Sequence, residues 1–119
     1  MRSGRRPRSC TPAAADPRRA PIAAYIIAEI DVTDPEAYKA YTARTPAAIQ
    51  KYGGKFIVRG GGNTLSLEGA PPQRIVVIEF PDKAAAERFY RAPDYQEILK
   101  LRLAASIGRM FIVEGFSPA

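Results

Sequence analysis

The stretch AAYIIAEIDVTDPE, residues 23–36, decides the fold because it joins a strand pattern directly to a helix start. Its first part alternates a purely apolar set of residues with a mixed set, which is typical of a strand with two different faces. Asp34 then supplies a capping side chain, Pro35 suits the first helical turn, and Glu36 suits the positive end of a helix. The stretch therefore predicts a strand followed by a helix.

The rest of the chain repeats this alternation of strands and helices. Further strands are predicted at 55–59, 73–80 and 109–116, where apolar residues recur at every second position. The first helix should end at Gly53-Gly54, because glycine favours the conformation that closes a helix. A second helical pattern begins at Asp82.

Two further features divide the second half of the chain. Pro93 is expected to break the helical pattern after Asp82 into two segments, the second beginning at the proline. Between the second and third strands, a glycine turn at 60–63 leads into a predicted short ribbon in which Leu65 and Leu67 point the same way.

The order of elements predicts the fold class. Strand, helix, strand, ribbon, strand, broken helix and strand form two β-α-β halves, with the helices on one face of an antiparallel sheet. This is the ferredoxin-like α+β arrangement. We expect it to occupy residues 22–117 as one domain, preceded by a disordered Arg/Pro-rich extension at 1–21.

The net charge of +6 at pH 7 belongs mostly to that extension. Residues 1–21 hold six arginines against Asp16 alone, whereas residues 22–119 hold the other 12 basic and 11 acidic side chains. The predicted domain is therefore nearly neutral, and we expect no nucleic-acid or membrane partner for it. The basic tail is expected to contact anionic surfaces weakly.

The absence of histidine from the chain excludes several kinds of site. It removes Ser-His-Asp and Cys-His nucleophilic sites, His-zinc sites and the usual haem ligand. The single cysteine, Cys10, cannot form an internal disulfide. Carboxylates, tyrosines and arginines remain as site chemistry, and we expect no cofactor, no metal and a cytoplasmic location.

One face of the predicted sheet is left without a cover, because the helices pack on the other. This open face is expected to carry a contiguous apolar set, which is too large to leave in water on a monomer. We therefore expect a homodimer that packs two such faces together. The set is Tyr25, Ile27, Ile57, Ile75, Val77, Met110 and Ile112.

Charged residues near the strand ends are predicted on this same open face. They are Glu29, Asp31, Arg59, Glu79 and Glu114. In one interpretation they line a pocket for a small polar molecule, with a glutamate acting as acid or base. In the other they form ion pairs at the rim of the sheet or at the dimer interface. The pattern alone leaves both open.

Tyrosines and Arg102 also have two interpretations each. Tyr38 and Tyr41 either stack on a ligand or bury their rings against the sheet with their hydroxyls at the edge. Tyr95 and Arg102 lie two helical turns apart and so project from one helix face. Arg102 either holds a substrate carboxylate or neutralises Glu79 or Glu114.

The chain also resembles the domain-of-unknown-function 1330 family over about residues 22–116. The resemblance rests on the stretches AYIIAEIDV (24–32), DPE (34–36) with Tyr38 and Tyr41, GGK (53–55), VRGG (58–61), LEG (67–69), VVIEFP (76–81), APDYQ (92–96) with Arg102, and VEG (113–115). It implies a dimeric α+β barrel, usually a small bacterial protein, without a settled activity. Relatives often carry a Trp just after Glu68-Gly69, where this chain has Ala70-Pro71-Pro72.

These observations lead to two functional hypotheses. In the first, a pocket binds a small polar or anionic organic molecule and supports acid–base chemistry without a cofactor. The alternative is a homodimer that binds a metabolite or serves a structural role without catalysis. By the resemblance, the candidate catalytic residues are Glu79 and Glu114, and the candidate ligand-binding residues are Tyr38, Tyr41, Arg59, Tyr95 and Arg102.

Overall fold

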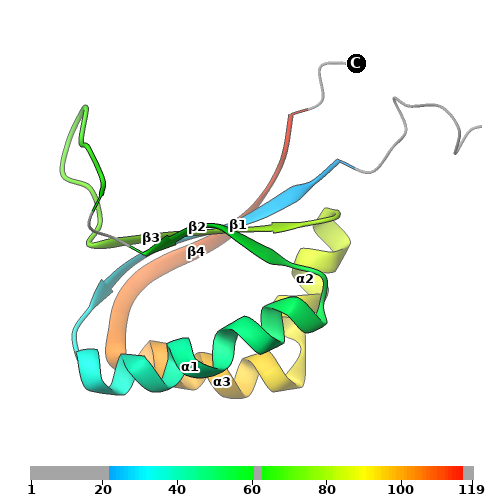
Figure 1. The fold of residues 1–119 in the computed structure, drawn as a ribbon, viewed down its shortest axis with the longest axis horizontal. Coiled ribbons are helices and arrows are strands. Elements are labelled where there is room, and N and C mark those ends of the chain that lie inside the picture. Colours follow the sequence, from blue (N-terminus) through cyan, green and yellow to red (C-terminus); the bar gives the residue numbers. More distant parts are fainter. Residues whose placement is uncertain (1–21, 61–62, 117–119) are drawn as a thin grey trace, which may run out of the picture.

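The computed structural model describes residues 22–60 and 63–116, so the predictions for residues 1–21 lie outside the described residues. The elements run in the order expected from the sequence (Figure 1). They are β1 (Ala24–Val32), α1 (Pro35–Lys51), β2 (Lys55–Gly60), β3 (Arg74–Phe80), α2 (Lys83–Arg91), α3 (Pro93–Ala105) and β4 (Ser106–Glu114).

The four strands form one antiparallel sheet in the order β2-β3-β1-β4. All three helices lie against the same side of it, as Figure 1 shows. We call this side the covered face and the opposite side the open face. The arrangement confirms the predicted ferredoxin-like α+β fold.

The start of α1 follows the capping signal in the sequence. The Asp34 carboxylate accepts a hydrogen bond from the Ala37 amide at 3.2 Å, and Pro35 occupies the first turn. The helix ends where Gly53 takes a φ of 87°, a left-handed conformation that glycine adopts without strain. Both ends of this helix were therefore predictable.

The second helical pattern is broken at the predicted place. Asp82 caps α2 by accepting from the Ala85 amide at 2.8 Å, and α3 begins at Pro93. Ala92, in extended conformation, separates the two helices. A proline has no amide hydrogen to donate, so it can start a helix but not continue one.

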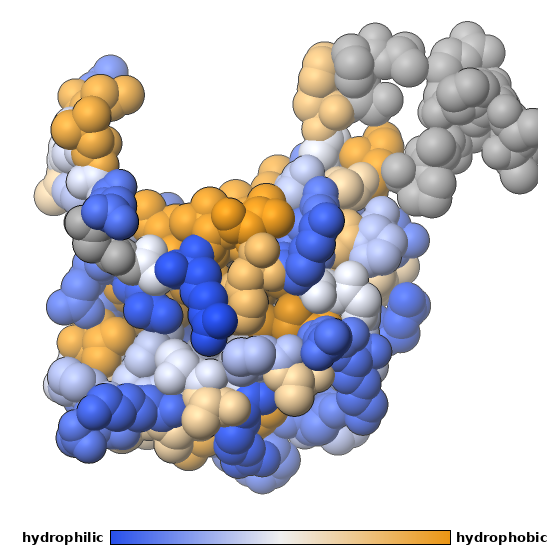
Figure 2. Space-filling view, viewed as in Figure 1, coloured by the Kyte–Doolittle hydropathy of each residue, from blue (hydrophilic) through white to orange (hydrophobic). Residues whose placement is uncertain are grey.

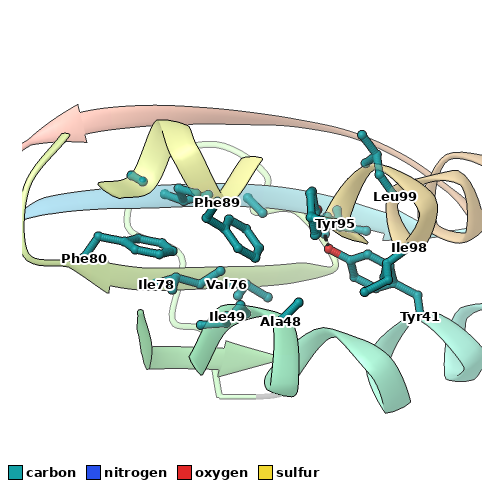
Figure 3. Close-up of a cluster of buried hydrophobic side chains, with 14 of the residues drawn as sticks. Tyr41, Ala48, Ile49, Val76, Ile78, Phe80, Phe89, Tyr95, Ile98 and Leu99 are labelled. Atoms are coloured by element: carbon teal, nitrogen blue, oxygen red, sulfur yellow. Dashed lines mark hydrogen bonds between the residues drawn. The ribbon is translucent and has the colours of Figure 1, made fainter. Parts of the chain in front are cut away.

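An aromatic cluster joins the helices to the covered face (Figure 3). Phe89 of α2 lies at its centre and is 0% exposed, with its ring centroid 4.4 Å from that of Tyr95 and 5.4 Å from that of Phe80. Ile26 and Ile49 are likewise fully buried in the same core. The three helices and the sheet therefore share one apolar core.

The prediction for the faces of β4 was wrong. Met110 pairs with Ala28 and Ile112 with Ile26, so both point to the covered face, where they pack on the core. Phe111 and Val113 point to the open face instead. Both sets are apolar, so alternation alone could not tell which set faced the helices; the register with β1 decides it.

The prediction that Arg59 lies on the open face was also wrong. The register of β2 shifts between Phe56 and Val58, because an irregularity there places an extra residue in the strand. Beyond it, Arg59 pairs with Val76 and points to the covered face. A bulge reverses the alternation of faces, and nothing in the local sequence predicted it.

No strand forms in residues 63–72, so the predicted ribbon is wrong. This segment, which we call the arm, rises from the sheet on the side of the open face (Figure 1). Leu65 and Leu67 are 82% and 88% exposed on it. Pro71, Pro72 and the glycines of this region oppose regular strand pairing.

The open face is apolar along its centre. Figure 2 shows hydrophobic residues gathered there, between the arm and the rising ends of β1 and β4. The pairing of the strands places on this face Tyr25, Ile27, Val58, Ile75, Val77, Ile107, Phe111 and Val113. Four of these, Val58, Ile107, Phe111 and Val113, are exposed large side chains.

Candidate functional site

A narrow pocket lies between α1 and the covered face. Apolar residues of the four strands form its floor, and its polar wall consists of Tyr38, Tyr41, Thr42 and Thr45 from α1 with Arg59 and Arg74 from the sheet. It has room for about two or three water molecules. The pocket is therefore small and largely apolar, with a few polar groups.

Two arginines stand at the edge of the pocket nearest β2. The Arg59 guanidinium carbon lies 4.6 Å from the centre of the Phe56 ring, and that of Arg74 lies 5.5 Å from the centre of the Tyr38 ring. Each aromatic face attracts the cation above it. The rings therefore help to hold both guanidinium groups at the pocket.

Neither arginine is neutralised by a carboxylate within 22–60 and 63–116. No salt bridge of Arg59 or Arg74 occurs among these residues, and no acidic side chain lines the pocket. The Nε atom of Arg74 is buried without a hydrogen-bond partner. Buried donors without partners are costly, so this wall of the pocket favours an anion.

Tyr41 and Tyr95 meet at the inner side of the pocket. Their hydroxyl oxygens are 2.8 Å apart in a buried hydrogen bond, with Tyr41 on α1 pointing toward Tyr95 on α3 (Figure 3). Burial raises the pKa of both phenols, and it also raises that of Tyr38, where Arg74 opposes the effect. All three tyrosines therefore stay protonated and able to donate at neutral pH.

Arg102 lies behind this pair and is only 5% exposed. Its Nε has no hydrogen-bond partner among the residues that the structure describes. Its positive charge acts on Tyr38, Tyr41 and Tyr95, since it opposes the rise in the pKa of each. A buried cation adjoins the tyrosines without a partner carboxylate in the described ranges.

The hydroxyl groups of the two threonines of α1 can accept hydrogen bonds from a ligand more readily than they can donate them. The Thr45 hydroxyl donates to the Tyr41 carbonyl at 2.5 Å, and the Thr42 hydroxyl donates to the Lys39 carbonyl at 3.1 Å. Their hydrogens are engaged within the helix. The donors left to meet a ligand therefore come from the arginines and tyrosines.

The structure separates the sequence-predicted site residues into two groups. Tyr38, Tyr41 and Arg59 line the pocket, with Tyr95 and Arg102 directly behind. The candidate catalytic residues Glu79 and Glu114 are not among its lining residues.

Glu79 lies on the open face, paired with Tyr25 across the strands. It accepts a hydrogen bond from the Tyr25 hydroxyl at 3.3 Å and forms an ion pair with Lys55 at 3.3 Å. Glu114 lies at the end of β4 opposite Ala24, not on the open face with Glu79 as predicted. The cause is the register of β4 described above, and a catalytic role for either residue stays a prediction.

Arg74 was missed as a site residue. It occupies the first position of β3 and has the same alternation as Val76, Ile78 and Phe80, which are apolar and buried. Arg74 is a charged residue at a position where the strand pattern expects a buried apolar one, and this exception could have indicated a site residue.

Within the part of the chain that the structure describes, no helix is long and apolar enough to cross a membrane. Residues 22–60 and 63–116 contain no group of three or more cysteine, aspartate or glutamate side chains placed to hold a metal ion.

Comparison with known proteins points to one family and one fold. The family model described as "Domain of unknown function (DUF1330)" matches residues 23–116, in agreement with the resemblance in the sequence. A comparison with proteins of curated function gives no significant match.

Solved structures with the same fold include proteins with and without a described activity. The RPA0582 protein of unknown function from Rhodopseudomonas palustris is 23% identical, with a TM-score of 0.67 over 82% of this chain and 85% of its own. SnoaB, a cofactor-independent oxygenase from Streptomyces nogalater, is 19% identical, with a TM-score of 0.57 over 81% and 95% of the two chains. At these identities the likeness concerns the fold alone.

Proposed function

The chain belongs to the domain of unknown function (DUF1330) family, and we propose that it binds a small carboxylate in the pocket between α1 and the sheet. The observation that carries this proposal is the pair Arg59 and Arg74, which stand at a pocket that no acidic side chain of residues 22–60 and 63–116 lines. A guanidinium group presents a planar fork of donors that matches a carboxylate.

The energetic argument starts from the unpartnered donors. The buried Nε of Arg74 forgoes a hydrogen bond that water would give it in the unfolded chain. A bound carboxylate would supply the missing acceptor and neutralise the local charge. The apolar floor would take the rest of the ligand, as is usual for small-molecule sites.

We further propose that the protein catalyses acid–base chemistry on the bound molecule without a cofactor. SnoaB is described as a cofactor-independent oxygenase, and a protein of this fold can therefore act without a bound cofactor. Glu79 and Glu114 remain the proposed proton-transfer residues, although the pocket of one chain does not include them. Simple carboxylate binding needs neither of them.

The arginines give the first test of binding. We expect Arg59→Met and Arg74→Met each to weaken the binding of pyruvate at least about tenfold, because each removes a charged hydrogen-bond donor worth ~1.5 kcal/mol or more. Isothermal titration calorimetry at constant ionic strength measures this. Methionine keeps much of the apolar length of the side chain.

Arg88→Met is the matched control, since Arg88 is an exposed arginine on α2 outside the pocket. Its affinity for pyruvate should stay within about twofold of the wild-type value. Equal weakening by all three substitutions would mean that binding follows the net charge of the protein, and the pocket proposal would fail.

We also propose that two copies of the chain pack through their open faces. The face carries a contiguous apolar surface that a monomer would leave in water. The arm rises on one side of this surface, and the ends of β1 and β4 rise on the other (Figures 1 and 2). Its carboxylates already have partners: Glu29 pairs with Arg109 at 2.8 Å and Glu79 with Lys55 at 3.3 Å, and Asp31 accepts a hydrogen bond from the Gln73 amide at 2.8 Å. A second copy could therefore pack here without leaving these charges unpaired.

A further inference from the structure

The pocket has two chemically different ends. At the edge nearest β2, Arg59 and Arg74 offer full positive charges. On the inner side, Tyr41 lines the pocket, and its neutral hydroxyl is hydrogen-bonded to that of Tyr95 on α3. A ligand that spans the pocket would therefore meet a cationic end and a hydroxyl end.

Two further polar groups, the Tyr95 hydroxyl and the Arg102 guanidinium, lie next to Tyr41 on the side away from the pocket. Tyr95, itself 0% exposed, shares the 2.8 Å hydrogen bond with Tyr41, and either oxygen can be the donor. When Tyr95 donates to Tyr41, the Tyr41 hydrogen is left free to bond to another acceptor. The buried positive charge of Arg102 lies behind both and favours negative charge on an oxygen in front of them.

We infer that the ligand is a short carboxylate with a second oxygen, a keto or enolate oxygen, that accepts a hydrogen bond from Tyr41. This inference rests on the proposed function, since it assumes that Arg59 and Arg74 hold the carboxylate. Tyr41 is then the residue that selects oxo acids over the parent acids. Arg102, 5% exposed and without a partner at Nε, is the positioning charge behind it.

The size of the pocket limits the length of the ligand. Because the pocket is small, only a short acid fits it. Pyruvate and 3-oxobutyrate are short oxo acids, and propionate and butyrate are their counterparts without the keto oxygen. The two pairs place the second oxygen at different distances from the carboxylate.

The test compares these four acids by calorimetry on the full chain. For at least one pair, we expect the wild type to bind the oxo acid about tenfold more tightly than the parent acid, the worth of one good buried hydrogen bond. In Tyr41→Phe this preference should fall to about twofold or less, while the parent acid binds as before. Arg88→Met should keep the wild-type preference.

The outcomes separate this inference from the proposed function. If the wild type binds all four acids equally, or if Tyr41→Phe keeps the preference, the inference is wrong although carboxylate binding stands. If the wild type binds none of them, the proposed function itself is wrong.

Tyr41→Phe leaves the Tyr95 hydroxyl without its partner and could lower stability, so circular dichroism must first show that it folds. Should it not fold, Tyr95→Phe replaces it. That variant keeps the Tyr41 hydroxyl and leaves its hydrogen free for the ligand, so the preference for the oxo acid should persist or rise, and its loss would contradict the donor role of Tyr41.

Discussion

Replacing Phe89 by alanine should lower the free energy of unfolding by about 3–5 kcal/mol. The side chain is 0% exposed and packs on Phe80 and Tyr95, so its removal leaves a cavity where helix and sheet meet. Such a loss is a large part of the total stability of a small domain. Urea unfolding followed by circular dichroism measures it.

The matched control is Phe116→Ala, because Phe116 is 90% exposed. The same substitution there should change the free energy of unfolding by no more than about 0.5 kcal/mol. A loss below about 1 kcal/mol in Phe89→Ala would mean that the aromatic cluster is not the centre of the core.

Placing a carboxylate on the open face should separate the proposed dimer. Phe111 is 42% exposed in the single chain and lies at the middle of β4, opposite Ile27. In Phe111→Glu, a charge without a partner would be buried on association, which costs several kcal/mol. We expect the dimer dissociation constant to rise at least about hundredfold, measured by sedimentation equilibrium.

Leu103→Glu provides the control for this experiment. Leu103 is also an exposed apolar residue, but it lies on α3, on the helix side of the molecule. This variant should sediment as the wild type does. A wild type that is monomeric at 100 micromolar, or a Phe111→Glu variant that remains dimeric, would contradict packing through the open face.

The order and ends of the elements were predictable where local chemistry decides them. Asp34 caps α1, Gly53 ends it and Pro93 starts α3, and each effect depends on neighbours in the sequence. The face of β4 was not predictable, because Met110 and Phe111 are both apolar. Only pairing with a distant strand decided between them.

The site was predictable in part for the same reason. Tyr38 and Tyr41 follow from the helical pattern of α1, whereas Arg59 reaches the pocket only through the irregularity in β2. Arg74 was signalled by its position in the alternation of β3. The contribution of Arg59 to the pocket therefore depends on pairing that no short stretch encodes, whereas that of Arg74 does not.

The central claim is that Arg59 and Arg74 hold a carboxylate in the pocket, and a titration followed at these side chains tests it most directly. In protein labelled with ¹⁵N, the Nε–H signals of arginine can be assigned with the methionine variants and followed as pyruvate is added. We predict saturable shifts of the Arg59 and Arg74 signals, with the Arg88 signal unchanged. Equal, non-saturating shifts of all arginine signals would contradict the account.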